Sequence, residues 1–101
     1  MTLKNALTIA GSDSGGGAGI QADIKSMSAN GVFATTVITA LTAQNTLGVT
    51  AIHDVPADFI AAQMDAVFFD IEISAVKIGM LSRAETISTV ANGLRRHHAR
   101  N

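Results

Sequence analysis

The sequence predicts an α/β protein whose sheet is largely parallel. Short uncharged segments rich in β-branched residues alternate with segments in which apolar residues recur every three or four positions. The expected order is strand, helix, strand, strand, helix, strand, helix, which is typical of a mainly parallel sheet covered by helices. With 101 residues, 48% of them hydrophobic, the chain has the size and composition of one small domain.

The first strand, at residues 6–10, leads through a glycine-rich turn into a helix at residues 18–30. The glycines at positions 15, 16, 17 and 19 carry no Cβ, so that a ligand or another backbone segment can approach closely. Residues 12–14 are turn and cap formers. The N-terminal amides of the helix offer a seat for a polar or anionic ligand. We expect the function to depend on this corner of the molecule.

The helix after this turn has an apolar stripe of Ile20, Ile24 and Met27, and Gly31 is suited to end it. At about 100° per residue, Asp23 falls at the edge of the stripe. Two interpretations stay open for this carboxylate. It either faces a cleft at the strand ends or is a solvated side chain that favours the helix dipole.

The second and third strands are expected at residues 32–42 and 49–55, joined by a loop at residues 43–48. A parallel crossover needs about a dozen residues or more, so this loop is too short for one. The two strands therefore form an antiparallel pair, or the third leaves the sheet as a flap. In both cases Gln44 and Asn45 lie where the chain reverses.

The remaining elements are a helix that begins at Pro56, a strand at residues 75–81 and a helix opened by a Ser82/Glu85 capping box. The predicted apolar stripes of the two helices are Ile60, Met64 and Val67, and Ile87, Val90 and Leu94. Lys77 lies in the apolar strand and is interpreted as a lysine that snorkels from the strand end.

Three segments follow predicted strands, at residues 11–13, 42–45 and 79–80. The carboxyl ends of parallel strands meet at one edge of a sheet, where ligands bind in α/β proteins. The Gln44 carboxamide offers a donor and an acceptor in one plane, which suits a flat heterocycle with a ring nitrogen beside an exocyclic amine. The alternative is a loop amide that holds its own turn, and the residues do not decide between them.

Other classes of site are disfavoured. No lysine follows the glycines as in a phosphate-binding loop, and the G-x-G-x-x-A pattern at residues 17–22 lies too far from the first strand for a dinucleotide fold. The three histidines are interpreted as incidental, with no metal site. A net charge of −1 gives no indication of binding to nucleic acid or an anionic membrane. With no cysteine, signal peptide or membrane span, we expect a cytoplasmic protein.

Three segments resemble the hydroxymethylpyrimidine/phosphomethylpyrimidine kinases of thiamine biosynthesis. They are AGSDSGGGAGIQADIK at residues 10–25, VITALTAQNT at residues 37–46 and KIGML at residues 77–81. The resemblance implies a ribokinase-like αβα three-layer sandwich, cut after about four strands and three helices. It also implies transfer of the ATP γ-phosphate to 4-amino-5-hydroxymethyl-2-methylpyrimidine and then to its monophosphate.

Carried over to matching positions, the resemblance implies substrate contacts from Gly11, Asp23 and Gln44, with Thr42 and Met80 as walls of the pyrimidine pocket. Members of this family are longer. Residues 1–101 are therefore expected to be the N-terminal, substrate-binding part of one domain, with the catalytic base and the ATP and Mg²⁺ contacts in a C-terminal part.

On this interpretation we expect the chain alone to transfer no phosphate and to be poorly folded or oligomeric; the resemblance is also compatible with a homodimer. Two alternatives stay open. One is a pyridoxine- or pyridoxal-type vitamin kinase, and the other is a non-catalytic, heterocycle-binding half-domain.

Overall fold

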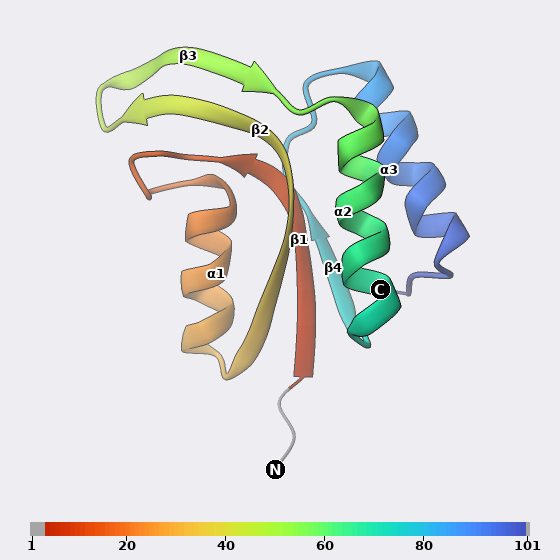
Figure 1. Ribbon diagram of the computed structural model, residues 1–101. Helices are drawn as coiled ribbons and strands as arrows, with labels where there is room; N and C mark the ends of the chain where they lie inside the picture. The colour runs from red at the N-terminus through yellow and green to blue at the C-terminus, as the bar shows by residue number, and fades with distance from the viewer. Residues whose placement is uncertain (1–3, 101) are drawn as a thin grey trace.

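The computed structural model describes residues 4–100, which form a four-stranded sheet with α1 on one face and α2 and α3 on the other (Figure 1). This arrangement confirms the predicted α/β class and the three layers. The elements are β1 (Lys4–Ser12), α1 (Gly19–Ala29), β2 (Val32–Asn45), β3 (Gly48–Asp54), α2 (Ala57–Asp70), β4 (Ala75–Ile78) and α3 (Ala84–Arg96).

The strands are arranged in the order β3-β2-β1-β4, with β1 parallel to both β2 and β4 and with β3 antiparallel to β2. The predicted antiparallel pair is therefore confirmed. The predicted loop at 43–48 is too long, because residues 43–45 still pair with β3. The predicted last strand is also too long: β4 ends at Ile78, and the Gly79 amide makes one further bond to the Ile9 carbonyl at 2.8 Å.

The hydrophobic core lies between the sheet and the α2/α3 layer. Ile9 and Val37 are paired in the parallel register and therefore point to the same face. The buried core residues are Leu7, Ile9, Val37, Ile60, Met64 and Val90. The opposite face of β1 carries the small side chains of Ala6, Thr8 and Ala10, so the contact with α1 contains much less apolar volume.

The predicted apolar stripes hold for α2 but only in part for the other helices. In α1, Ile20 is buried whereas Ile24 is 36% exposed. In α3 the buried residues are Thr86, Val90 and Gly93, and Ile87 is exposed. Position 93 faces Met64 so closely that a Cβ there would lie 2.5 Å from the Met64 sulfur. Close approach of the two helices thus selects small residues that hydrophobic periodicity does not mark.

The start of α3 also differs from the prediction. The helix begins at Ala84 with Arg83 at the N-cap position, and no side chain caps it. The Glu85 carboxylate lies 3.3 Å from the Arg83 guanidinium instead of reaching back to a capping residue. The predicted capping box at Ser82 and Glu85 is therefore wrong.

Two further contacts stabilise the packing of α2, one with the sheet and one with the residues that follow α3. Gln63 of α2 accepts a hydrogen bond from the Ile38 amide and donates one to the Ile38 carbonyl, both at 2.9 Å, where β2 has no β3 partner. The second contact involves His97, which was interpreted as incidental but is packed into the fold, with only 8% of its side chain exposed. Its ring stacks on Phe68 with centroids 4.9 Å apart, and its Nε2 lies 2.7 Å from the Asp65 carboxylate.

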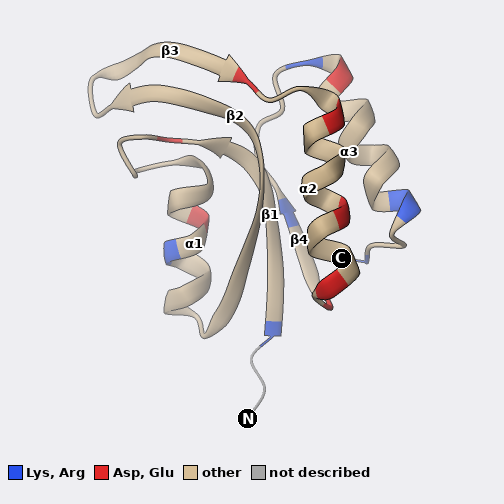
Figure 2. Cartoon of the chain, in the orientation of Figure 1, with Lys and Arg blue, Asp and Glu red and all other residues tan. Residues whose placement is uncertain are grey.

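Charged residues are concentrated on the helices and their connections. Figure 2 shows β2 and most of β3 free of lysine, arginine, aspartate and glutamate, and the first charged residue after Lys25 is Asp54. In the described part of the chain, no helix is long and apolar enough to cross a membrane.

Candidate functional site

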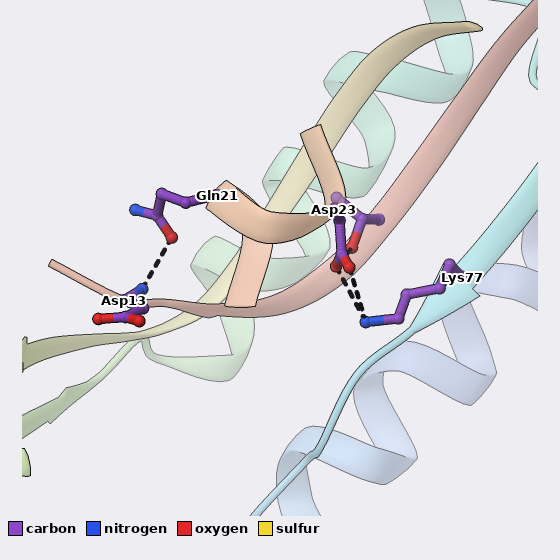
Figure 3. Close-up of polar contacts among 5 residues, drawn as sticks. Asp13, Gln21, Asp23 and Lys77 are labelled. Carbon is purple, nitrogen blue, oxygen red and sulfur yellow. Dashed lines mark hydrogen bonds and ion pairs between the residues drawn. The ribbon is translucent and has the colours of Figure 1, made fainter. Parts of the chain in front are cut away.

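The glycine-rich turn after β1 is organised by one buried carboxylate. Asp13 Oδ1 accepts a hydrogen bond from the Gly15 amide at 2.7 Å, and Oδ2 accepts from the Gly17 and Ala18 amides at 3.0 and 2.8 Å. The seat expected for an anionic ligand at the start of α1 is therefore filled by the side chain of Asp13. The Asp13 amide in turn donates to Gln21 Oε1 at 2.8 Å, which ties the turn to α1 (Figure 3).

Gly19 is the glycine whose conformation this corner requires. Its φ is +59°, a value that L-residues rarely adopt, and a Cβ there would overlap the Gly11 carbonyl oxygen. The first turn of α1 therefore lies directly against the end of β1, with an isolated bridge between Ser12 and Gly19.

The end of β2 forms the second side of the site. Thr42 Oγ1 lies 2.7 Å from the Ser12 carbonyl oxygen and 3.1 Å from Gln44 Oε1. The main chain of Gln44 is fixed, because Ser14 Oγ donates to its carbonyl at 2.6 Å and accepts from its amide at 2.7 Å. The Gln44 side-chain nitrogen, Nε2, has no hydrogen-bond partner among residues 4–100.

The third side is formed by β4 and α1 together. Thr8 and Lys77 are neighbours in the parallel register, and both reach Asp23 of α1. The Asp23 carboxylate accepts a hydrogen bond from Thr8 Oγ1 at 2.6 Å and pairs with Lys77 Nζ at 2.9 Å (Figure 3). Burial alone would raise the pKa of Asp23. The hydrogen bonds from Thr8 and Lys77 and the positive charge of Lys77 outweigh burial and hold the pKa below its usual value.

These three sides enclose a cavity of about 380 Å³, a volume in the range of small-molecule sites. Four of the predicted site residues line it: Gly11, Thr42, Gln44 and Met80. The other lining residues are Ala10, Ser12, Asp13, Ala18, Gly19, Lys77 and Gly79. The three strand ends predicted to meet are therefore brought together, at one edge of the sheet.

Asp23 does not line the cavity but faces the sheet and contacts the lining residue Lys77. Of the two interpretations of Asp23, the structure excludes the solvated one, because its side chain is only 16% exposed. Lys77, which is predicted to snorkel from the strand end, pairs with Asp23 and lines the cavity, and the sequence interpretation missed this place in the site. No signal in the sequence marks this place, because it depends on the pairing of β4 with β1.

The carboxylates near the cavity do not fit a magnesium site. Asp13 is occupied by backbone amides, and Asp23 is occupied by Thr8 and Lys77. Among residues 4–100, no three His, Cys, Asp or Glu side chains are grouped so that they could hold a metal ion.

Comparisons with known proteins identify the family of the chain. Residues 13–101 match the family described as phosphomethylpyrimidine kinase. A hydroxymethylpyrimidine/phosphomethylpyrimidine kinase of Rhizobium meliloti (strain 1021) is 68% identical over 91 residues, which are 90% of this chain and 34% of the relative. The chain thus spans about a third of the length of that relative.

Solved structures of kinases also match the fold of this chain. The crystal structure of phosphomethylpyrimidine kinase from Clostridium difficile 630 matches with a TM-score of 0.91 and 53% identity, covering 94% of this chain and 41% of that one. A pyridoxal kinase from Bacillus subtilis, solved as an ADP complex, matches with a TM-score of 0.89 and 34% identity over 99% of this chain and 38% of that one. The kinase fold implied by the resemblance is confirmed.

Proposed function

Since the chain belongs to the phosphomethylpyrimidine kinase family, we propose that it forms the substrate-binding part of a hydroxymethylpyrimidine/phosphomethylpyrimidine kinase. The substrate is 4-amino-5-hydroxymethyl-2-methylpyrimidine and then its monophosphate, as in thiamine biosynthesis. Residues 1–101 would make up the substrate side of a single ribokinase-like domain. The cytoplasmic localisation and the homodimer stay predictions.

The observation that carries the proposal is the position of Gln44. Its main chain is held on both sides by Ser14, its side chain lines the cavity, and its Nε2 has no partner among the described residues. A carboxamide fixed in this way can donate to a ring nitrogen and accept from an exocyclic amine in one plane. Gly11 and Met80, from two other strand ends, line the same cavity and leave room for a flat ring.

The reaction of such a kinase is phosphoryl transfer from ATP. The hydroxymethyl oxygen forms a bond to the γ-phosphorus, the bond from that phosphorus to the β–γ bridging oxygen breaks, the hydroxyl proton leaves, and ADP is released. In the second round a phosphate oxygen of the monoester takes the place of the hydroxyl oxygen. The contribution of the described residues is to bind and orient the pyrimidine, because positioning is a large part of catalysis in this chemistry.

No catalytic base is assigned within residues 4–100. Asp13 and Asp23 are the carboxylates nearest the cavity, and both are engaged in hydrogen bonds inside the fold. We therefore expect the base and the ATP contacts in a part of the kinase beyond these residues. The chain alone is expected to bind the pyrimidine without transferring phosphate to it.

A pyridoxal-type vitamin kinase is the second candidate, supported by the 34% identity to the Bacillus subtilis pyridoxal kinase. Pyridoxine is also a flat hydroxymethyl heterocycle, but it lacks the amine beside a ring nitrogen that Gln44 is suited to read. Calorimetric titration of the chain with hydroxymethylpyrimidine and with pyridoxine separates the two candidates. Tighter binding of pyridoxine would favour the second.

The test of the first candidate is Gln44→Leu. Loss of the amide leaves polar groups of the bound pyrimidine unpaired, which weakens binding by about 1–3 kcal/mol. The matched control is Asn92→Leu, which removes an exposed amide from α3 outside the cavity. Unchanged pyrimidine affinity in Gln44→Leu would refute the role of Gln44.

A further inference from the structure

Lys77 is the one cationic residue that lines the cavity in the described part of the chain. It is the neighbour of Thr8 in the parallel register of β1 and β4, and its side chain is 49% exposed. Gly79 keeps this part of the cavity open. A Cβ at position 79 would lie 3.6 Å from Lys77 Nζ and 2.8 Å from the Ala10 Cβ.

The ion pair with Asp23 holds the Lys77 ammonium in one position. Lys77 lines the cavity, whereas its partner Asp23 is only 16% exposed and does not line it. Both Asp23 oxygens lie within 3.1 Å of Nζ, and Thr8 Oγ1 fixes the carboxylate from the other side. Of the two charged groups of the pair, only the ammonium therefore belongs to a residue that lines the cavity.

Asp13 is the other charged residue of the lining. Its two carboxylate oxygens accept the three backbone amides of the glycine turn, which partly balance its negative charge. The second lysine near the turn, Lys25, donates to the Gly16 carbonyl at 2.8 Å and does not line the cavity. A negatively charged ligand group in the cavity therefore has the Lys77 ammonium as its cationic partner among the described lining residues.

We propose that Lys77, held by Asp23, determines the preference of the cavity for the phosphorylated form of the heterocycle over the neutral alcohol. This inference rests on the proposed function, in which the two successive substrates differ only by a phosphate group. A phosphomonoester carries a charge of about −1.5 to −2 at neutral pH. An ammonium has three donors, so Lys77 can contact a phosphate oxygen while it keeps its bonds to Asp23.

The experiment is calorimetric titration of the full chain with the hydroxymethylpyrimidine and with its monophosphate. In Lys77→Met we expect the affinity for the monophosphate to fall about tenfold and that for the alcohol to change by less than about twofold. Lys4→Met is the matched control, since it removes an exposed lysine at the opposite end of the sheet. Lys77→Arg keeps the charge and should retain most of the preference.

A second readout needs no substitution. Raising the ionic strength should weaken binding of the monophosphate relative to the alcohol in the unmodified chain, because a half-exposed ion pair with the ligand is screened by salt. This readout keeps the inference testable if Lys77→Met does not fold. A monophosphate-to-alcohol affinity ratio that is insensitive to salt would then overturn it.

The outcomes distinguish the two levels of the proposal. If the alcohol and the monophosphate both bind, and Lys77→Met weakens both equally or neither, the role of Lys77 is wrong while the proposed function stands. If neither ligand binds the unmodified chain under conditions where it sediments as one species, the proposed function fails, and the inference about Lys77 fails with it. Selective loss of the monophosphate in Lys77→Met, with no loss in Lys4→Met, supports the role of Lys77.

Discussion

We predict that Gly19→Ala destabilises the fold far more than Gly31→Ala, although both glycines have a positive φ, +59° and +73°. An L-residue in this left-handed region costs about 1–2 kcal/mol, which applies equally to the two positions. Nothing lies within 4 Å of a Cβ at position 31. At position 19 the Cβ would overlap the Gly11 carbonyl oxygen and lie 3.2 Å from the Asp13 amide nitrogen.

The added steric conflict at position 19 involves backbone atoms, which cannot move aside as a flexible side chain can. Overpacking of this kind costs about 1–3 kcal/mol in addition to the strain of the positive φ. We therefore expect a loss of about 2–5 kcal/mol for Gly19→Ala and about 1–2 kcal/mol for Gly31→Ala. The effect of each substitution on the entropy of the unfolded chain is the same and cancels in the comparison.

The measurement is the free energy of unfolding from urea titrations of the two variants and the unmodified chain, at a protein concentration where one species sediments. Titration with hydroxymethylpyrimidine should show weaker binding in Gly19→Ala only, because Gly11 and Gly19 line the cavity. Losses of stability that agree within about 0.5 kcal/mol would refute the close approach of α1 to the end of β1.

Four further measurements test other parts of the structure. The pKa of Asp23 is lowered, so its ion pair contributes stability above the ordinary value of 3.8, and that contribution is lost as the pH falls through the lowered pKa. In Asp23→Asn this part of the acid-induced loss should be absent from urea titrations. Gln63→Leu leaves the Ile38 amide and carbonyl unpaired and should cost about 1–3 kcal/mol in the same assay. Gly79→Ala should cost about 1–3 kcal/mol through its 2.8 Å conflict with a side chain of β1, whereas Gly11→Ala, 3.6 Å from its nearest neighbour, should cost about 1 kcal/mol or less. The hairpin of β2 and β3 carries no charged residue before Asp54 and exposes several large apolar side chains, so it should lead the chain to self-associate. A monomer with a sharp melting transition would contradict this expectation.

The element order and the antiparallel pair could be predicted because both depend on local information. Periodicity identified the strands and helices, and the length of the loop at residues 43–48 excluded a parallel crossover. The boundaries were less accurate, because pairing partners decide where a strand ends. Residues 43–45 read as a loop from their composition, yet β3 lies beside them and extends the ladder.

The face of α3 could not be predicted from hydrophobicity. Gly93 is buried because α3 lies close to Met64 of α2. Thr86 is buried on the same helix, and Ile87 is left at the surface. The distance between two helices is a tertiary property, and nothing in the local sequence records it. The predicted cap at the start of α3 is absent because Glu85 pairs with Arg83 instead of reaching back to Ser82.

Most of the cavity could be predicted from topology, because the carboxyl ends of β1, β2 and β4 meet wherever those strands are neighbours. That reasoning brought Gly11, Gln44 and Met80 to one place, and their roles as substrate contacts stay predictions. Lys77 needed two facts that no single segment contains. They are the pairing of β4 beside Thr8 and the rotation of α1 that turns Asp23 toward both.

The packing of α1 couples ligand affinity to the stability of the fold. The β1 residues facing α1 are Ala6, Thr8 and Ala10, which bury little apolar volume, and Ile20 is the one buried residue of the helix. Hydrogen bonds from the Asp13 amide to Gln21 and from Thr8 to Asp23 therefore help to fix the helix at the cavity edge. A substitution that removes such a contact should move the cavity wall as well as lower the stability. Affinity and the free energy of unfolding should therefore fall together in variants of Gln21 and Asp23, whereas in variants of Gln44, whose side chain holds no helix in place, affinity should fall alone.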